Sequence, residues 1–240
     1  MTEERRIGVI TPSGNVVVER VTNAILAQVP GVHAHYTRVD VHGNTTATNP
    51  TTHDFDAMLG AAELLSHLRP DVICWNGSKG GGLGFVPDEE LCTRIETRTG
   101  VRAVTSALAT LDLLRDFGAR SYALITPYDR AYQEKLIRGF AGQGFRCAAE
   151  RHSGLTDNLG YAAVTPAAIA EMARGAIGEA KADAIICFCT NFYGALAADM
   201  LEAELDIPVI DATAVGVWAS LRAIGAERGG VKGWGRIFSR

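Results

Sequence analysis

The sequence has no excess of basic residues. It contains 23 Lys and Arg and 27 Asp and Glu, which gives a formal net charge of −4. The basic residues form no run of the kind that binds nucleic acid or an anionic membrane. No stretch approaches the roughly 18 apolar residues of a membrane-spanning helix. The opening stretch MTEERRIGVITPSGN also lacks the apolar segment of a signal peptide. We therefore expect neither nucleic acid nor a membrane as a partner, and a cytoplasmic location.

A disulfide framework and a metal site are missing as well. The five cysteines are an odd number without a secretory signal, and no Cys-x-x-Cys pair or His cluster completes a metal-ligand set. The glycine-rich stretch NGSKGGGLGF (residues 76–85) does not fit a P-loop, which places Lys-Ser/Thr after its last glycine, and it has no dinucleotide-binding fingerprint. Its glycines instead indicate a loop whose backbone approaches a small carboxylate or moves as a lid.

What the sequence does contain is an alternation of short apolar runs and longer helical patterns. With 240 residues and 47% hydrophobic content, the chain can bury a sizeable core. Helical spacing of alanine and leucine is clear in AMLGAAELLSHL and AAIAEMARGAIGEA. The predicted strands are residues 7–11, 72–75, 101–105, 122–126, 184–188 and 209–210. Strand and helix repeated in this way predict an α/β fold with parallel sheets.

An internal repeat divides the chain into two related halves. Residues 10–12 recur as 125–127, 71–78 as 183–190, and 114–119 as 221–226, at offsets of 115, 112 and 107. Three matches in the same order indicate a duplicated unit with small insertions. We expect a first half over 1–118, completed by the tail 215–240, and a second half over 119–214. Ligands of open α/β sheets bind beyond the carboxyl ends of the strands, so the two sheets would share one cleft.

The repeat separates Cys189 from the other cysteines. Cys189 matches Gly77, just beyond a predicted strand, whereas Cys74 and Cys187 lie within strands and are expected in the core. A helix is predicted over 195–204, directly after Cys189. Backbone N–H groups and the helix dipole at that point would lower the pKa of the Cys189 thiol.

Six motifs together resemble the aspartate/glutamate racemase superfamily, and within it the branch of maleate isomerases and arylmalonate decarboxylases. The motifs are TPSGN from Thr11, WNGSKG from Trp75, ITPY from Ile125, HSGLTDN from His152, CTN from Cys189 and GWGRIF from Gly233. The resemblance implies two similar α/β domains related by a pseudo-two-fold axis, with the active site in the cleft between them. It also implies no cofactor, and proton chemistry at a carbon beside a carboxylate.

The sequence departs from the racemases and maleate isomerases at one position. The resemblance implies that those enzymes flank the substrate with two cysteines, whereas here Gly77 stands in the first place and only Cys189 remains. Arylmalonate decarboxylases are similar in having a glycine and a single cysteine. We therefore expect a decarboxylase of a malonate-type diacid, in which Cys189 protonates an enediolate. The alternatives are a maleate isomerase-like or amino-acid racemase-like isomerase, and a non-catalytic protein that binds small acids.

An enediolate needs hydrogen-bond donors where its charge develops, and the predicted loops supply them. The residues expected to contact a small carboxylate substrate are Pro12, Asn15, Gly77, Ser78, Lys79, Tyr128, Asn158, Thr190 and Asn191. Asn15 could equally cap the helix that follows it, and Lys79 could be a solvated loop charge. Leu83, Phe85, Tyr161 and Phe192 are candidates for apolar pocket walls. The oligomeric state stays open, and an oligomer is possible.

Overall fold

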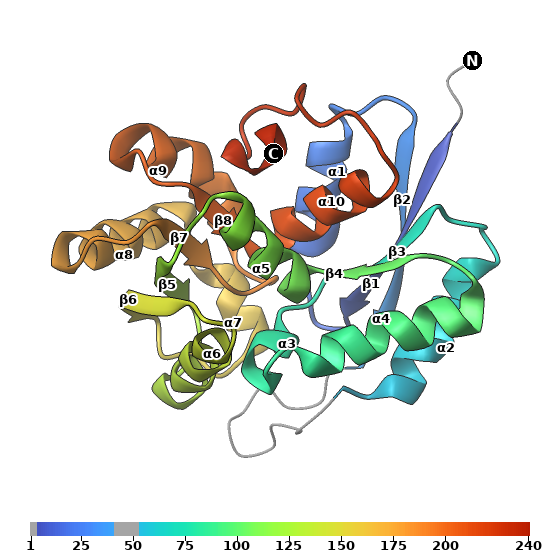
Figure 1. Ribbon diagram of the computed structural model, residues 1–240, viewed down its shortest axis with the longest axis horizontal. Helices are drawn as coiled ribbons and strands as arrows, with labels where there is room; N and C mark the ends of the chain where they lie inside the picture. Colours follow the sequence, from blue (N-terminus) through green and yellow to red (C-terminus); the bar gives the residue numbers. More distant parts are fainter. Residues whose placement is uncertain (1–3, 41–52) are drawn as a thin grey trace.

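The computed structural model describes residues 4–40 and 53–240, and it contains two four-stranded parallel sheets (Figure 1). In the first sheet the spatial order is β2 (Val32–Val39), β1 (Arg5–Pro12), β3 (Val72–Trp75) and β4 (Ala103–Thr105). In the second it is β6 (Arg146–His152), β5 (Ser121–Thr126), β7 (Ala184–Cys187) and β8 (Val209–Asp211). The strand order is the same in both sheets, which confirms the predicted α/β fold of two similar domains.

Helices surround both sheets, and several begin at a side chain that accepts a backbone N–H. Asp54 caps α2 by accepting from Ala57 N at 3.1 Å. The α-helices are α1 (Val18–Leu26), α2 (Phe55–Ser66), α3 (Lys79–Leu83), α4 (Val86–Thr99), α5 (Ser106–Asp116), α6 (Arg130–Gly142), α7 (Asn158–Ala163), α8 (Pro166–Glu179), α9 (Ala198–Leu205) and α10 (Ala212–Ala223). Two 3-10 helices are η2 (Tyr193–Ala197) and η3 (Arg236–Ser239). No helix in the described part of the chain has the length and apolarity to cross a membrane.

The repeated segments occupy equivalent places in the two halves. Residues 71–78 and 183–190 contain β3 and β7, and each segment runs from its strand into the loop beyond it. Helices α5 and α10 both end at a glycine with positive φ, 68° at Gly118 and 67° at Gly225. A glycine with positive φ commonly ends an α-helix. The match between residues 114–119 and 221–226 therefore reflects the same kind of helix end in both halves.

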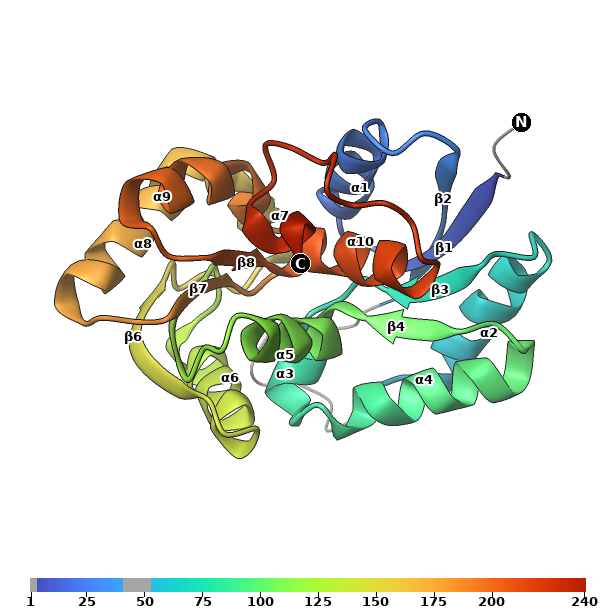
Figure 2. The same cartoon turned by 45° about the horizontal axis from the view of Figure 1, so that its top comes forward.

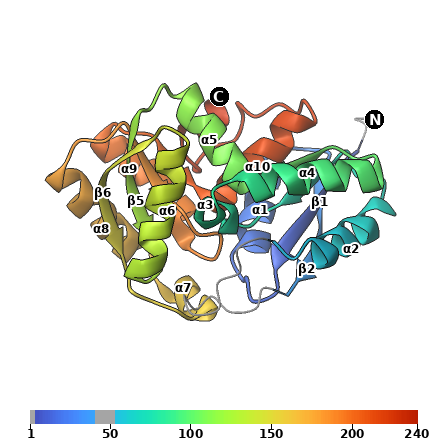
Figure 3. The same cartoon turned by 60° about the horizontal axis from the view of Figure 1, so that its bottom comes forward.

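The two halves interlock through their helices. Helix α10 follows the second sheet along the chain, yet it packs against α1, β3 and β4 of the first half (Figure 2). The tail after α10 returns to α1, where Gln28 Nε2 donates to Lys232 O at 3.0 Å. On the other side α3 packs against α6 (Figure 3). The division into 1–118 with 215–240 and 119–214 stays a prediction.

The glycine-rich stretch is helical over Lys79–Leu83, where the sequence predicted a loop. A Cβ on Gly81 would lie 2.5 Å from Phe188 Cε1, and a Cβ on Gly139 of α6 would overlap Gly81 O. Both glycines therefore allow α3 and α6 to approach closely. This packing places Ser78 and Lys79 at the boundary between the two halves.

Candidate active site

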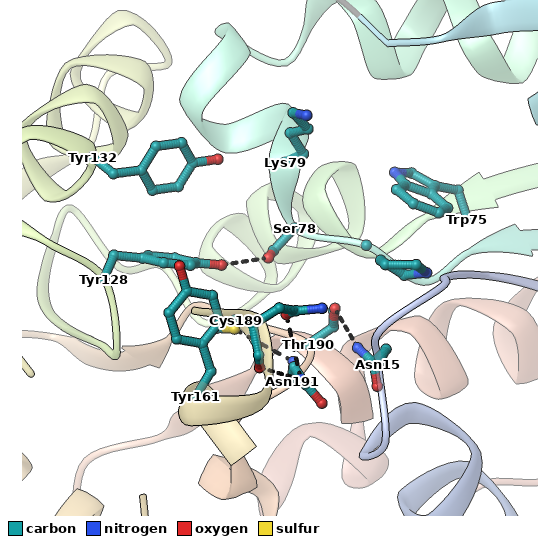
Figure 4. A pocket seen from close by; sticks show the side chains of 13 residues that line it. Asn15, Trp75, Ser78, Lys79, Tyr128, Tyr132, Tyr161, Cys189, Thr190 and Asn191 are labelled. Carbon is teal, nitrogen blue, oxygen red and sulfur yellow. Dashed lines mark hydrogen bonds between the residues drawn. The ribbon is translucent and has the colours of Figure 1, made fainter. Parts of the chain in front are cut away.

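The carboxyl ends of β1, β3, β5 and β7 meet at a cavity of about 50 Å³ (Figure 4). It is lined by Pro12, Asn15, Trp75, Gly77, Ser78, Lys79, Tyr128, Tyr132, Asn158, Tyr161, Cys189, Thr190 and Asn191. These residues include all ten that the sequence named as catalytic or substrate-binding, although their roles stay predictions. Of the proposed wall residues, Tyr161 lines the cavity, whereas Leu83, Phe85 and Phe192 do not. Sequence reasoning missed Trp75 and Tyr132 as lining residues.

Cys189 lies two residues beyond the end of β7, with 3% of its surface exposed. Burial raises the pKa of its thiol to about 12, while hydrogen bonds with Tyr128 and the Asn191 N–H act weakly in the opposite direction. The expected lowering of this pKa is therefore wrong, because desolvation outweighs the single N–H that reaches the sulfur, from Asn191 at 3.4 Å. At neutral pH the sulfur carries its proton. Cys74 and Cys187 are buried in the sheets, as predicted.

An indole ring fills the space beside Gly77, the position that matches Cys189 in the repeat. A Cβ on Gly77 would overlap the Trp75 ring, with Cη2 only 2.8 Å away. Trp75 is 1% exposed, and the ring of His53 packs edge-on against it at 6.1 Å between centroids. The Nε2 of His53 is in turn 2.7 Å from Asp88 Oδ2, and both of these side chains are fully buried. The indole is thus held in the space that a longer side chain at position 77 would need.

Neutral hydroxyl groups from both halves converge beside Cys189. Ser78 Oγ of the first half is 3.1 Å from Tyr128 Oη of the second. Tyr132 and Tyr161 pack edge-on against Tyr128, with ring centroids 4.7 and 5.1 Å from it. Burial raises the pKa of each of these three tyrosines, well above the ordinary value for Tyr128. All three keep their phenolic protons at neutral pH and can act as hydrogen-bond donors.

The asparagines of the cavity join the halves. Asn15 Oδ1 accepts from Val17 N and Val18 N, both at 2.9 Å, just before α1, whose N-cap residue is Val17. Its Nδ2 also donates to Thr190 Oγ1 at 3.2 Å, which places the same side chain at the cavity. Asn191 Oδ1 accepts from Val16 N at 2.9 Å, and its Nδ2 donates to Asn158 O at 2.6 Å. Asn191 is therefore largely occupied in holding the loops together.

Lys79 is the only charged side chain among the lining residues. It is half-buried, and within residues 4–40 and 53–240 its ammonium group makes no ion pair or side-chain hydrogen bond. Burial without a counter-ion lowers its pKa. No three His, Cys, Asp or Glu side chains in the described residues lie together as metal ligands. The cavity thus combines one cation, neutral donors and a protonated thiol.

The family model for arylmalonate decarboxylase matches residues 81–238. The chain belongs to the arylmalonate decarboxylase family, and it is an isomerase or a decarboxylase.

Relatives of both kinds resemble the chain. The maleate isomerase of Nocardia farcinica is 29% identical over 230 residues, which is 92% of this chain and 90% of that protein. The arylmalonate decarboxylase of Bordetella bronchiseptica is 28% identical over 149 residues, 62% of each chain. A solved structure of a variant of the maleate isomerase Iso from Pseudomonas putida S16 with maleate has a TM-score of 0.86 at 26% identity, covering 99% of this chain and 98% of that one.

Proposed function

We propose that the protein is a cofactor-independent decarboxylase of malonate-type diacids. The observation that carries this proposal is the asymmetry of the cavity: Cys189 lines one side, whereas Gly77 and the indole of Trp75 stand in the matching place. Racemisation by two bases, or thiol addition from the first half, needs a reactive group in that place. Decarboxylation followed by protonation from one side needs only one.

The first step breaks the bond between the α-carbon and one carboxylate. CO2 leaves, and the electron pair of that bond delocalises into the remaining carboxylate to give an enediolate. The hydroxyl groups of Ser78, Tyr128 and Thr190 line the cavity and can donate to its two oxygens. Such fixed donors stabilise developing charge strongly where water is excluded. The raised pKa of Tyr128 supports this role, because the hydroxyl is neutral when the charge forms.

In the second step the Cys189 thiol gives its proton to the α-carbon, and the thiolate regains a proton from solvent. A thiol with a pKa of about 12 is protonated in nearly every molecule at neutral pH, as an acid must be. Because one donor lies on one side of the cavity, the product of a prochiral malonate would be largely one enantiomer.

A maleate isomerase-like reaction is the second candidate, since relatives that match over 92% or more of this chain are named maleate isomerase. In that case Cys189 would have to act on the double bond with help from a group other than a second cysteine, such as Lys79 or a cavity tyrosine. The two reactions give different products, so one experiment distinguishes them.

The test is proton NMR in deuterated buffer with phenylmalonate, isobutylmalonate and maleate as separate substrates. We expect CO2 loss from a malonate with one solvent deuteron at the α-carbon, and no fumarate from maleate. Cys189→Ser should lower the rate about 10²- to 10⁴-fold, the usual contribution of a general acid. Cys92→Ser, which changes a cysteine outside the cavity, is the control and should keep the wild-type rate. Full turnover by Cys189→Ser, or fumarate without CO2 release, would overturn the proposal.

A further inference from the structure

Three residues with hydrogen-bond donor groups line the cavity, and Figure 4 draws them on the other side of Ser78 from Cys189. The donor groups are the ammonium of Lys79, the indole N–H of Trp75 and the hydroxyl of Tyr132. Figure 4 shows the nitrogen of Lys79, the nitrogen of Trp75 and the oxygen of Tyr132 on this side, whereas Thr190 and Asn191 lie with Cys189 on the other. We call the three residues the donor cluster.

Within the part of the chain that the structure describes, no group accepts a hydrogen bond from the donor cluster. Trp75 Nε1 is buried and has no hydrogen-bond partner, and leaving such a group unpaired is costly. Burial raises the pKa of Tyr132, which keeps its hydroxyl a donor. The buried carboxylate of Asp88 pairs with His53 through Oδ2 at 2.7 Å, and its Oδ1, although it has no hydrogen-bond partner, accepts from none of the three donors. The donors of the cluster are therefore available to a hydrogen-bond acceptor on a bound ligand.

Charge favours an anion as that acceptor. Lys79 has no ion-pair partner in residues 4–40 and 53–240. A half-buried ammonium gains most from an opposite charge that enters the same cavity. The thiol side of the cavity already has Ser78, Tyr128 and Thr190 for the carboxylate that becomes the enediolate. A second anion-binding region is thus available for a different part of the substrate.

We propose that the donor cluster binds a carboxylate on the side arm of the substrate, so that the substrate is a malonate with a carboxylate-bearing arm and not an aryl malonate. This inference rests on the proposed function and specifies its substrate class. Lys79 is then a specificity-determining residue, and the first-half side of the cavity selects the substrate while the second-half side protonates it.

Ethane-1,1,2-tricarboxylate is the smallest compound of this class. Loss of CO2 from its malonate carbon breaks one carbon–carbon bond and leaves the electron pair in an enediolate. The thiol proton of Cys189 then moves to that carbon, and water returns a proton to the sulfur. The product is succinate, and no oxidant, reductant or second substrate is consumed.

The experiment compares two substrates whose arms have the same shape and different charge. Ethane-1,1,2-tricarboxylate carries CH2–CO2⁻, and isobutylmalonate carries the neutral CH2–CH(CH3)2. We expect kcat/KM to favour the tricarboxylate by about 100-fold, the scale of a buried charge-assisted pair. Lys79→Met should reduce that ratio to about 10 or less, mainly through KM for the tricarboxylate. Lys79→Arg, which keeps the charge, should restore part of the ratio.

The control is Lys181→Met, which removes an exposed lysine at the other end of β7 and should leave the ratio unchanged. Thermal melts of each variant test for loss of folding. Calorimetry with succinate gives a second measurement, and its affinity should fall in Lys79→Met. Equal kcat/KM for both substrates, or a ratio that Lys79→Met does not change, would overturn the carboxylate arm and leave decarboxylation standing. Lys79-dependent binding of succinate without CO2 release from any malonate would instead overturn the proposed function and support the donor cluster.

Discussion

The indole of Trp75 lies where a side chain at position 77 would project, so that a Cβ added to Gly77 would have the Trp75 Cη2 at 2.8 Å. The Trp75 ring thus limits which side chains can stand at position 77. A cysteine could not be placed opposite Cys189 without moving a ring that is 1% exposed and packed against His53. The position of the Trp75 ring therefore requires glycine at position 77.

The first prediction concerns Gly77→Cys. Alone, this substitution should lower decarboxylation at least about 10-fold and reduce the free energy of unfolding by roughly 1–3 kcal/mol, the cost of overpacking a buried site. Combined with Trp75→Leu, the new thiol should gain room opposite Cys189. The double variant should then exchange the α-hydrogen of a chiral monoacid, the product of a malonate with two different α-substituents, with deuterated solvent and racemise it.

Trp75→Leu alone is the control, since it opens the space without adding a thiol. Chiral chromatography and NMR of the α-proton measure the exchange. A Gly77→Cys protein that racemises the product with unchanged stability would show that the indole does not obstruct this place.

The second prediction concerns the hydrogen bond between Ser78 Oγ and Tyr128 Oη, 3.1 Å across the two halves. Ser78→Ala and Tyr128→Phe should each lower kcat by about 10²-fold, the scale for loss of one donor to a developing oxyanion. Because each hydroxyl orients the other, the double variant should lose less than the product of the two single losses. Tyr122→Phe removes a buried hydroxyl outside the cavity, and it should leave kcat unchanged. Losses confined to KM would contradict a role in the transition state.

The third prediction is the pH dependence of the rate. A thiol acts as an acid only while protonated, and burial raises the pKa of Cys189 from 9.0 to about 12. With isobutylmalonate, whose arm is neutral, kcat should therefore stay constant from pH 8 to pH 10. An ordinary thiol would lose most of its protonated form over that interval. Stopped-assay measurements of CO2 release give the profile, and a decline centred near pH 9 would contradict burial of the thiol.

Much of the fold could be predicted from the sequence, because parallel strands buried on both faces appear as short apolar runs. The duplication was visible because loop motifs such as those around Gly77 and Cys189 recur at the ends of equivalent strands. Ligands of α/β sheets bind beyond the carboxyl ends of the strands, and from this rule we predicted that the ten named residues share one cavity, as they do. The helical form of Gly80 and Gly81 was missed, since close packing of α3 on α6 is a tertiary requirement.

The electrostatics of the site could not be predicted in the same way. The position of Cys189 before a helix suggested a lowered pKa, but the degree of burial depends on residues brought in from distant parts of the chain. Trp75 is in sequence an ordinary strand residue, and its ring enters the cavity only because Gly77 leaves space for it. Tyr132 lies on the first turn of α6, where amphipathic spacing does not reveal that it faces a cavity.

The fourth prediction concerns stability and Asp211, which caps α10 by accepting from Thr213 N at 2.9 Å and Ala214 N at 3.0 Å. Burial raises the pKa of this carboxyl from 3.8 to about 7 in the folded protein. Between those values the unfolded chain is ionised at Asp211 while the folded protein still holds the proton. The folded state then binds more protons, so this group lowers the free energy of unfolding as pH rises from 4 to 7, by up to roughly 1.4 kcal/mol per pH unit.

Asp211→Asn keeps an oxygen that can accept from the same two N–H groups and removes the titration. Relative to the wild type, the variant should therefore gain stability as pH rises from 5 to 7, by on the order of 2 kcal/mol, with no further gain above pH 8. Urea unfolding of both proteins at pH 5, 6, 7 and 8 measures the difference, and groups common to both cancel in it. Parallel stability curves would mean that Asp211 ionises in the folded protein as easily as in the unfolded chain. A difference that grows with pH would show that the N-terminus of α10 is held by a carboxyl that is protonated in acid and costly to ionise in place.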